Sequence, residues 1–111
     1  MSQSRLLRAD EKALLAALIS KAHGPEDLIK SLSDCRVEEM SDGGMGSLRF
    51  SPQDGRPRRL GERLLDAEFA DVDGVPIMVR VNLDDCGELY ELDIWKVDFS
   101  PVVRFPSVGE V

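Results

Sequence analysis

The stretch with the clearest chemical potential is DGGMGS, Asp42 to Ser47, which holds three glycines in six residues. Glycine-rich loops can cradle phosphates, because their backbone amides approach an anion closely. A phosphate-binding loop also needs a lysine before a helix, and a dinucleotide-binding loop needs glycines that open a helix. Here no lysine follows, and the alternating residues of SLRF indicate a strand. We therefore expect a hairpin turn, with a backbone-amide anion site as the alternative.

The anion-site alternative draws on the positive charge that follows this stretch. Arg49 comes almost directly after the glycines, and a cluster of arginines lies in the next expected loop. These side chains could grip an anionic ligand or the acidic half of another copy of the chain, although a solvated loop is the simpler interpretation. The residues of this alternative site are Gly43, Gly44, Gly46, Arg49, Arg56, Arg58 and Arg59.

Groups suited to metal binding or catalysis are sparse. The segment from Asn82 to Asp93 comes nearest to a calcium loop, but a cysteine stands where an oxygen ligand is needed, and its flanks resemble strands. His23 is the only histidine, and Cys35 and Cys86 are too far apart for a CxxC motif. The sequence therefore gives little support to a histidine-based triad or a zinc site. We expect no catalytic residue, no metal, no cofactor and two reduced cysteines. The enzyme question stays open, with a non-enzyme favoured.

Charge divides the chain into two unequal parts. Residues 1–65 hold 11 basic and 10 acidic side chains, whereas residues 66–98 hold 10 acidic and two basic ones, a net charge of −8. This distribution argues against nucleic acid as a partner, because phosphates would be repelled from the acidic half. It fits a basic protein partner, or simply a solvated acidic surface.

An interaction site is expected where acidic and aromatic side chains occur together near the C-terminus. Outward carboxylates would attract a basic protein, and an exposed tryptophan would anchor an interface. A tryptophan in the core and ordinary solvated acids are the simpler interpretation. The residues of this expected site are Glu91, Asp93, Trp95 and Asp98.

Two helices are expected near the N-terminus. Apolar side chains recur at helical spacing after Asp10, the expected N-cap, and Gly24 is the expected C-terminal stop. His23, at the end of this helix, is explained by capping without catalysis. A second helix starts at Pro25, which suits a first helical position, and continues to Ser33.

Short alternating segments predict strands in the rest of the chain. Two short segments flank the glycine stretch, and residues 51–63, with two prolines, two glycines and four arginines, should hold no regular element. A meander of strands then covers residues 63–72, 75–83 and 89–99, with turns at Asp73-Gly74 and at DDCGE. The last strand carries apolar residues on both faces, which predicts a central or bulged strand.

These elements predict an α+β fold, with two N-terminal helices packed on an antiparallel sheet of about five strands. The helices should cover the apolar face and leave the acidic residues outward. We expect one domain over residues 1–111, with a core of about 6–101 and an extended tail of 102–111. An exposed edge strand near Phe50 or the tail would allow a homodimer. No membrane-length apolar run and no export signal appear, so we expect a cytoplasmic protein without membrane contact.

Two blocks, DGGMGSLRF and LYELDIWKVDFSP, give the chain a resemblance to an uncharacterised family of small bacterial domains. The similarity runs from about Leu6 through Pro101. The resemblance implies a bacterial origin and one domain, and it carries over no activity, cofactor or functional residue.

Two functions remain as hypotheses. The first is a non-catalytic protein-interaction module with an acidic sheet face, for example an immunity protein that occludes a basic toxin. The alternative is a binder of, or an enzyme acting on, a small anionic ligand at the glycine turn and arginine loop.

Overall fold

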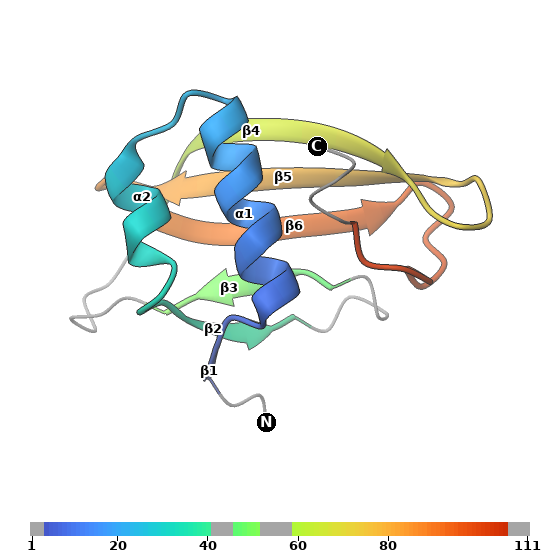
Figure 1. Ribbon diagram of the computed structural model, residues 1–111, viewed down its shortest axis with the longest axis horizontal. Coiled ribbons are helices and arrows are strands. Elements are labelled where there is room, and N and C mark those ends of the chain that lie inside the picture. The colour runs from blue at the N-terminus through green and yellow to red at the C-terminus, as the bar shows by residue number, and fades with distance from the viewer. Residues whose placement is uncertain (1–3, 41–45, 52–58, 107–111) are drawn as a thin grey trace.

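A computed structural model gives the fold and describes residues 4–40, 46–51 and 59–106. In this part of the chain, two helices and six strands form an α+β structure, and the strands make one sheet (Figure 1). The predicted fold class and the antiparallel sheet are confirmed. The helices are α1 (Ala9–Lys21) and α2 (Glu26–Ser31), and the strands are β1 (Arg5–Leu6), β2 (Arg36–Glu39), β3 (Leu48–Phe50), β4 (Leu60–Ala70), β5 (Pro76–Asp84) and β6 (Leu89–Lys96).

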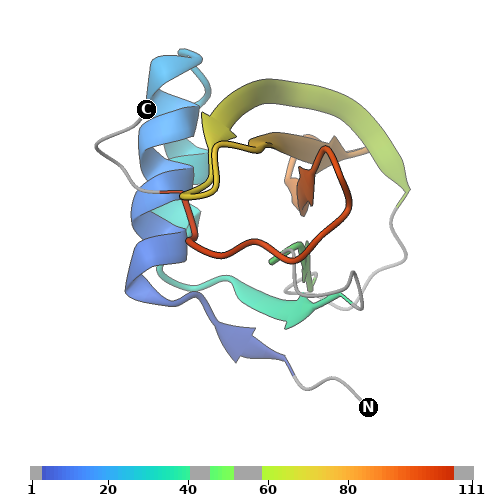
Figure 2. The same ribbon diagram turned by 90° about the vertical axis from the view of Figure 1, so that its right-hand side faces the viewer.

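The strands follow the order β1-β2-β3-β6-β5-β4, and each neighbouring pair is antiparallel. The sheet curves, and α1 lies across the open side of the curve (Figure 2). The core fills the space between the helices and the concave face of the sheet. Its largest contributors from the helices are Leu14, Leu15, Leu18, Ile19, Leu28 and Leu32. Among the described residues, neither helix is long and apolar enough to cross a membrane.

The sheet has one strand more than the five expected, because β1 leaves no pattern in the sequence. A strand of two residues is too short to alternate visibly, and tertiary contacts hold it in place. Arg5 pairs with Val37 of β2, and its guanidinium donates to both carboxylate oxygens of Glu11 in α1, at 2.8 and 3.0 Å. Burial by itself would raise the pKa of Glu11, but the bonds from Arg5 and the Arg8 amide hold that pKa below its ordinary value.

The edges of the sheet are β1 and β4, not the strand that contains Phe50. That strand, β3, lies between β2 and β6, and Phe50 is buried opposite Val37. The expectation of an edge strand near Phe50 is therefore wrong. In the described part of the tail, Val102 and Phe105 pack against the core, while residues 107–111 lie outside the described residues.

Strand β4 begins earlier than predicted, at Leu60. The expectation that residues 51–63 hold no regular element is wrong for 60–63, while residues 52–58 lie outside the described part. The register between β4 and β5 shifts twice before Leu65, so no simple alternation marks this part of the strand. Gly61 allows the close approach, since a Cβ there would lie 2.2 Å from the carbonyl oxygen of Asp84.

The ends of α1 differ from the predicted caps. Arg8, and not Asp10, is the N-cap, and its backbone N–H donates to the carboxylate of Glu11 at 2.8 Å. At the other end His23 takes the left-handed conformation, with φ 55°, while the Gly24 N–H donates to the carbonyl of Ile19 at 2.9 Å. Gly24 is needed for space, because a Cβ there would lie 2.8 Å from the Ile19 side chain.

Pro25 is the N-cap of α2 rather than its first helical residue. Its extended ψ of 132° turns the chain before the helix begins at Glu26.

Strand β6 is both central and irregular, as its two apolar faces predicted. It lies between β3 and β5, and its register with β5 shifts between Asn82 and Leu83. This shift lets Leu89 enter the core together with Leu92, although the two differ in parity. Trp95 lies on the opposite face and is half-buried.

Candidate functional site

The expected interaction residues of β6 lie on the outer face of the sheet, away from the helices. They alternate along the strand with buried residues of the core. Strand register places the outer residues in rows that cross the strands. The rows are Glu38–Arg49–Glu91–Asn82–Arg63, then Asp93–Arg80–Asp66, then Trp95–Met78–Glu68.

Acidic and basic side chains are paired within these rows. Glu91 accepts a hydrogen bond from the amide of Asn82 at 2.9 Å and forms an ion pair with Arg49 at 3.4 Å. Arg80 bonds to Asp66 at 2.8 Å, and its guanidinium lies 5.6 Å from the centre of the Trp95 ring. The half-buried Trp95 therefore belongs to a network that covers part of its ring.

The outer face is less acidic than the sequence indicated. The described rows contain five carboxylates and three arginines, which gives a net charge of −2. Of the ten acids in residues 66–98, four lie on this face, two in the β4–β5 turn, three at the β5–β6 hairpin and one after β6. The negative charge is therefore spread over several places.

The glycine stretch connects β2 and β3, which are antiparallel, so the predicted hairpin is confirmed. Residues 41–45, including Gly43 and Gly44, lie outside the described residues. At the end of the stretch Gly46 has φ +97°, and the Met40 N–H donates to the Ser47 carbonyl at 3.0 Å. The Ser47 side chain points inward and binds the backbone of Ile94, donating to its carbonyl at 3.0 Å and accepting from its N–H at 2.9 Å.

Among the described arginines of the alternative anion site, the side chain of Arg49 is already engaged. Arg49 pairs with Glu91 and lies 5.3 Å from the centre of the Tyr90 ring. The backbone carbonyl of Arg59 accepts from the Asp85 N–H at 3.0 Å, at the start of β4. Arg56 and Arg58 lie outside the described residues. Of the residues in this alternative site, the structure describes Gly46, Arg49 and Arg59.

The β5–β6 hairpin confirms the turn expected between Asn82 and Asp93. The buried carboxylate of Asp84 accepts from the backbone N–H groups of Cys86, at 2.8 Å, and Glu88, at 3.0 Å. The ligand atoms of Asp84, Asp85 and Cys86 lie within 4.8 Å of one another. Because the turn itself uses the Asp84 carboxylate, we assign this cluster a structural role. No disulfide joins Cys35 to Cys86 in the structure.

A buried ion-pair network at the opposite end of the sheet was not foreseen. Lys96 is 1% exposed, and its ammonium lies 3.0 Å from the carboxylate of Asp71 and 2.5 Å from that of Asp73. Asp71 also accepts from the backbone N–H groups of Val103, at 2.7 Å, and Arg104, at 3.0 Å. The network therefore ties the β4–β5 turn and the C-terminal segment to the end of β6.

The pKa values in this network move in the directions that stabilise the charged forms. The pKa of Asp71 would be raised by burial, but its bonds to backbone amides and to Lys96 hold it far below the ordinary value. The hydrogen bond from Lys96 lowers the pKa of Asp73, and the bond to Asp73 raises the pKa of Lys96. One sequence signal was available, since Lys96 shares the inward parity of Leu92 and Ile94.

Four exposed apolar residues are tied through their backbones to this network or to the strand ends beside it, and we call them the Phe99 patch. The backbones of its members meet at the Asp71 end of the sheet, through bonds to Asp71, Lys96 and Pro76. Phe99 is 75% exposed and has a left-handed φ of 61°. The members of the patch are Val72, Val97, Phe99 and Val103.

Asp98, the fourth residue of the expected interaction site, lies within this end of the sheet. Its carboxylate accepts from the backbone N–H of Ser100 at 3.0 Å and from the hydroxyl at 2.6 Å, and these bonds lower its pKa. The Phe99 N–H donates to the Lys96 carbonyl at 2.8 Å. The turn that presents Phe99 is therefore held from both sides.

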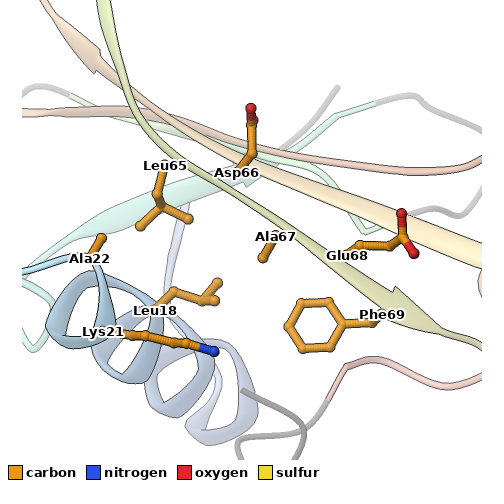
Figure 3. Close-up of a pocket in the computed structure, with 8 residues that line it drawn as sticks. All are labelled: Leu18, Lys21, Ala22, Leu65, Asp66, Ala67, Glu68 and Phe69. Carbon is orange, nitrogen blue, oxygen red and sulfur yellow. The ribbon is translucent and has the colours of Figure 1, made fainter.

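A groove of about 270 Å³ lies between α1 and the edge strand β4 (Figure 3). Leu65, Ala67 and Phe69 point from β4 toward the helix, where Leu18 and Lys21 face them. Asp66 and Glu68 point to the other side of the strand. Apolar side chains of β4 and α1 therefore face each other across the groove, and Lys21, Asp66 and Glu68 also line it, so its surface is mixed in polarity.

A second cavity of about 340 Å³ lies where α2 meets β3 and the β5–β6 hairpin. Leu28, Phe50 and Leu89 contribute apolar walls, and Cys35 lies among them with its thiol 3.8 Å from the hydroxyl of Ser31. The charged residues of its lining, Asp27 and Glu88, are exposed to solvent.

Comparison with protein families assigns most of the chain to one family. A model for a domain of unknown function (DUF6984) matches residues 4–106. No curated protein and no solved structure shows a significant match to the chain.

Proposed function

The chain belongs to this family of domains of unknown function, and we propose that it is a non-catalytic protein-interaction module for a basic partner. The observation that carries the proposal is Phe99, a large aromatic side chain presented to solvent by a backbone conformation that non-glycine residues rarely adopt. The proposal keeps the expected class of function and centres the contact surface on the Phe99 patch and Asp98.

The energetics of Phe99 favour a role in binding. An exposed phenylalanine forgoes about 2 kcal/mol of apolar burial in the folded chain. A left-handed φ at a non-glycine residue costs a further ~1 kcal/mol or more. A partner that covers the ring would recover the apolar burial, while the backbone cost remains as the cost of presenting the ring to solvent. Aromatic anchors of this kind are common at interface centres.

Charge near the patch supports a basic partner. Asp98 precedes Phe99 directly, and the carboxylate of Asp73 is 42% exposed. Residues 66–98 carry a net charge of −8. Complementary charge would speed association and make it sensitive to salt, as expected of an immunity protein that neutralises a basic toxin.

The test is capture of a partner from lysate of the source organism by immobilised protein, eluted with rising salt and identified by mass spectrometry. Phe99→Gly removes the ring at a position that suits glycine, so the fold is retained. Leu60→Ser is the control, because Leu60 is also an exposed apolar residue, at 57% against 75% for Phe99, and lies at the far end of β4. A basic protein that is retained by the wild type and by Leu60→Ser, and lost from Phe99→Gly, supports the proposal. Equal capture by all three chains contradicts it.

The alternative, a small anionic ligand at the glycine turn, ranks second. Arg49 would have to leave Glu91 and Tyr90 to reach such a ligand. Thermal unfolding with and without inorganic phosphate tests it, because a ligand of the native state raises Tm. A rise that Arg49→Gln abolishes would favour this alternative over the interaction module.

A further inference from the structure

Strand β4 offers a free edge for backbone pairing. It is the last strand of the sheet, has 11 residues and pairs with β5 on one side, while no described strand lies on its other side. An exposed edge of this length is a template onto which a further extended segment can add. Beside this edge lies the groove between α1 and β4 (Figure 3).

The side chains of β4 alternate in direction beside the groove. Leu65, Ala67 and Phe69 point toward α1, whereas Asp66 and Glu68, which also border the groove, point toward the outer face. The side chains of an added strand would alternate in the same way. Those opposite Leu65, Ala67 and Phe69 would therefore also enter the groove. Its remaining residues would lie beside the two carboxylates.

From this arrangement we infer that the β4 edge binds an extended segment of the partner protein in which apolar and basic residues alternate. The apolar side chains enter the groove between α1 and β4, and the basic ones lie beside Asp66 and Glu68. The inference rests on the proposed function, and it specifies the chemistry of the partner and a surface separate from the Phe99 patch.

Charge selects this occupant over a second copy of the chain. If two copies paired antiparallel through β4 around Ala67, each Asp66 would face a Glu68 of the other copy. A register centred on Asp66 or on Glu68 would set that carboxylate against itself. Like charges directly opposite are destabilising, whereas opposite charges stabilise a strand pair. The edge therefore disfavours self-pairing and favours a basic segment.

The surroundings of Asp66, Glu68 and Lys21 indicate where the basic side chains of the bound segment would lie. Asp66 already bonds to Arg63 and Arg80, whereas Glu68 is exposed and makes no ion pair among the described residues. Glu68 is thus the stronger attractor. On the groove side Lys21 lines the wall with its aliphatic stem and disfavours a second cation there. A basic residue is therefore less favourable in the groove than an apolar one, and the alternation sets which face of the segment is inward.

The experiment is a titration of the ¹⁵N-labelled full chain with blocked synthetic peptides, followed by amide chemical shifts. The probes are acetyl-Val-Lys-Val-Lys-Val-Lys-Val-amide and the same peptide with glutamate in place of lysine. We expect shifts centred on β4 and on the facing side of α1, and about fivefold to tenfold tighter binding of the lysine peptide at low salt. This preference should shrink as salt rises.

Glu68→Lys should reverse the preference between the two peptides, and Glu26→Lys, an exposed change on α2, should leave it unchanged. Equal binding of both peptides, no shift at β4, or an unchanged preference in Glu68→Lys would overturn the inference. A concentration-dependent dimer in sedimentation, with shifts at β4, would overturn it in favour of a second copy.

The inference and the proposed function fail in different ways. A captured partner that Phe99→Gly loses and Glu68→Lys retains in full would leave the proposed function standing and refute the edge site. A partner that both variants retain would refute the Phe99 surface, while the peptide titration still decides the edge site.

Discussion

Replacement of Ser47 by alanine should destabilise the fold far more than the loss of a surface hydroxyl. The last register pair between β3 and β6 is Leu48 with Leu92, so β3 provides no ladder pair for Ile94. The Ser47 hydroxyl takes that place by donating to the Ile94 carbonyl and accepting from its N–H. Ser47 is 3% exposed and Ile94 1%, so water cannot easily substitute.

The magnitude follows from the two backbone groups that Ser47→Ala would leave unsatisfied. Each buried polar group without a partner costs about 1–3 kcal/mol. With partial relief by relaxation, we expect the free energy of unfolding to fall by about 2–4 kcal/mol, and Tm by roughly 10 °C for a domain of this size. Ser33→Ala is the control, because Ser33 bonds to Lys12 on the exposed surface, and its loss should cost less than about 0.5 kcal/mol.

Urea unfolding followed by circular dichroism measures this difference, and the m-value should not change. Hydrogen exchange adds a local readout, since the amide of Ile94 should exchange much faster in Ser47→Ala. A loss no larger than that of Ser33→Ala, or unchanged protection of the Ile94 amide, would refute the claim that Ser47 completes the sheet.

Three further predictions concern the ends of the sheet. Lys96→Met should lower Tm strongly because it leaves the buried carboxylate of Asp71 without its cation, and adding Asp71→Asn should recover part of the loss. Thermal unfolding against pH gives the sign: the low pKa of Asp71 makes its stabilisation complete above about pH 4 and lost as pH falls, and the raised pKa of Lys96 makes its contribution complete below about pH 10 and lost as pH rises. In the variant that carries both Lys96→Met and Asp71→Asn, Tm should depend less on pH at both ends of the range than it does in the wild type. The same dependence of Tm on pH in both proteins would argue against the network. Phe99→Gly should leave Tm unchanged or raise it, since glycine tolerates the positive φ, and a drop above about 5 °C would show that the ring supports the fold. Gly61→Ala should lower Tm more than Gly87→Ala does, because a Cβ at 61 would lie 2.2 Å from a backbone oxygen, whereas one at 87 has nothing within 4 Å and costs only the strain of its positive φ of 82°; equal Tm losses would contradict this.

Local chemistry explains why much of the architecture could be predicted from the sequence. The helical spacing in α1 and the strict alternation in β5 depend on neighbours within the same element, so they are visible without tertiary information. The Asp73-Gly74 turn is equally local, and Gly74 has the expected positive φ. Even the irregularity of β6 was visible, because apolar residues on both parities indicate a shift in register.

The candidate surfaces depended on contacts between distant segments, which local patterns do not encode. Alternation marked Glu91 as outward but could not show that Arg49 would lie beside it, since β3 and β6 are about 40 residues apart in the sequence. The network around Lys96 joins three separate segments, and only their packing makes a buried lysine tolerable.

The sequence by itself therefore determined the fold class, the meander of its C-terminal half, the main turns and the excess of negative charge. The tertiary structure decided which strands form the edges and which apolar side chains stay exposed. It also decided which acidic side chains pair with arginines and where on the surface the acidic residues lie. The physical reason is range: periodicity and turn chemistry act over a few residues, whereas strand order and charge pairing follow from which distant segments pack together.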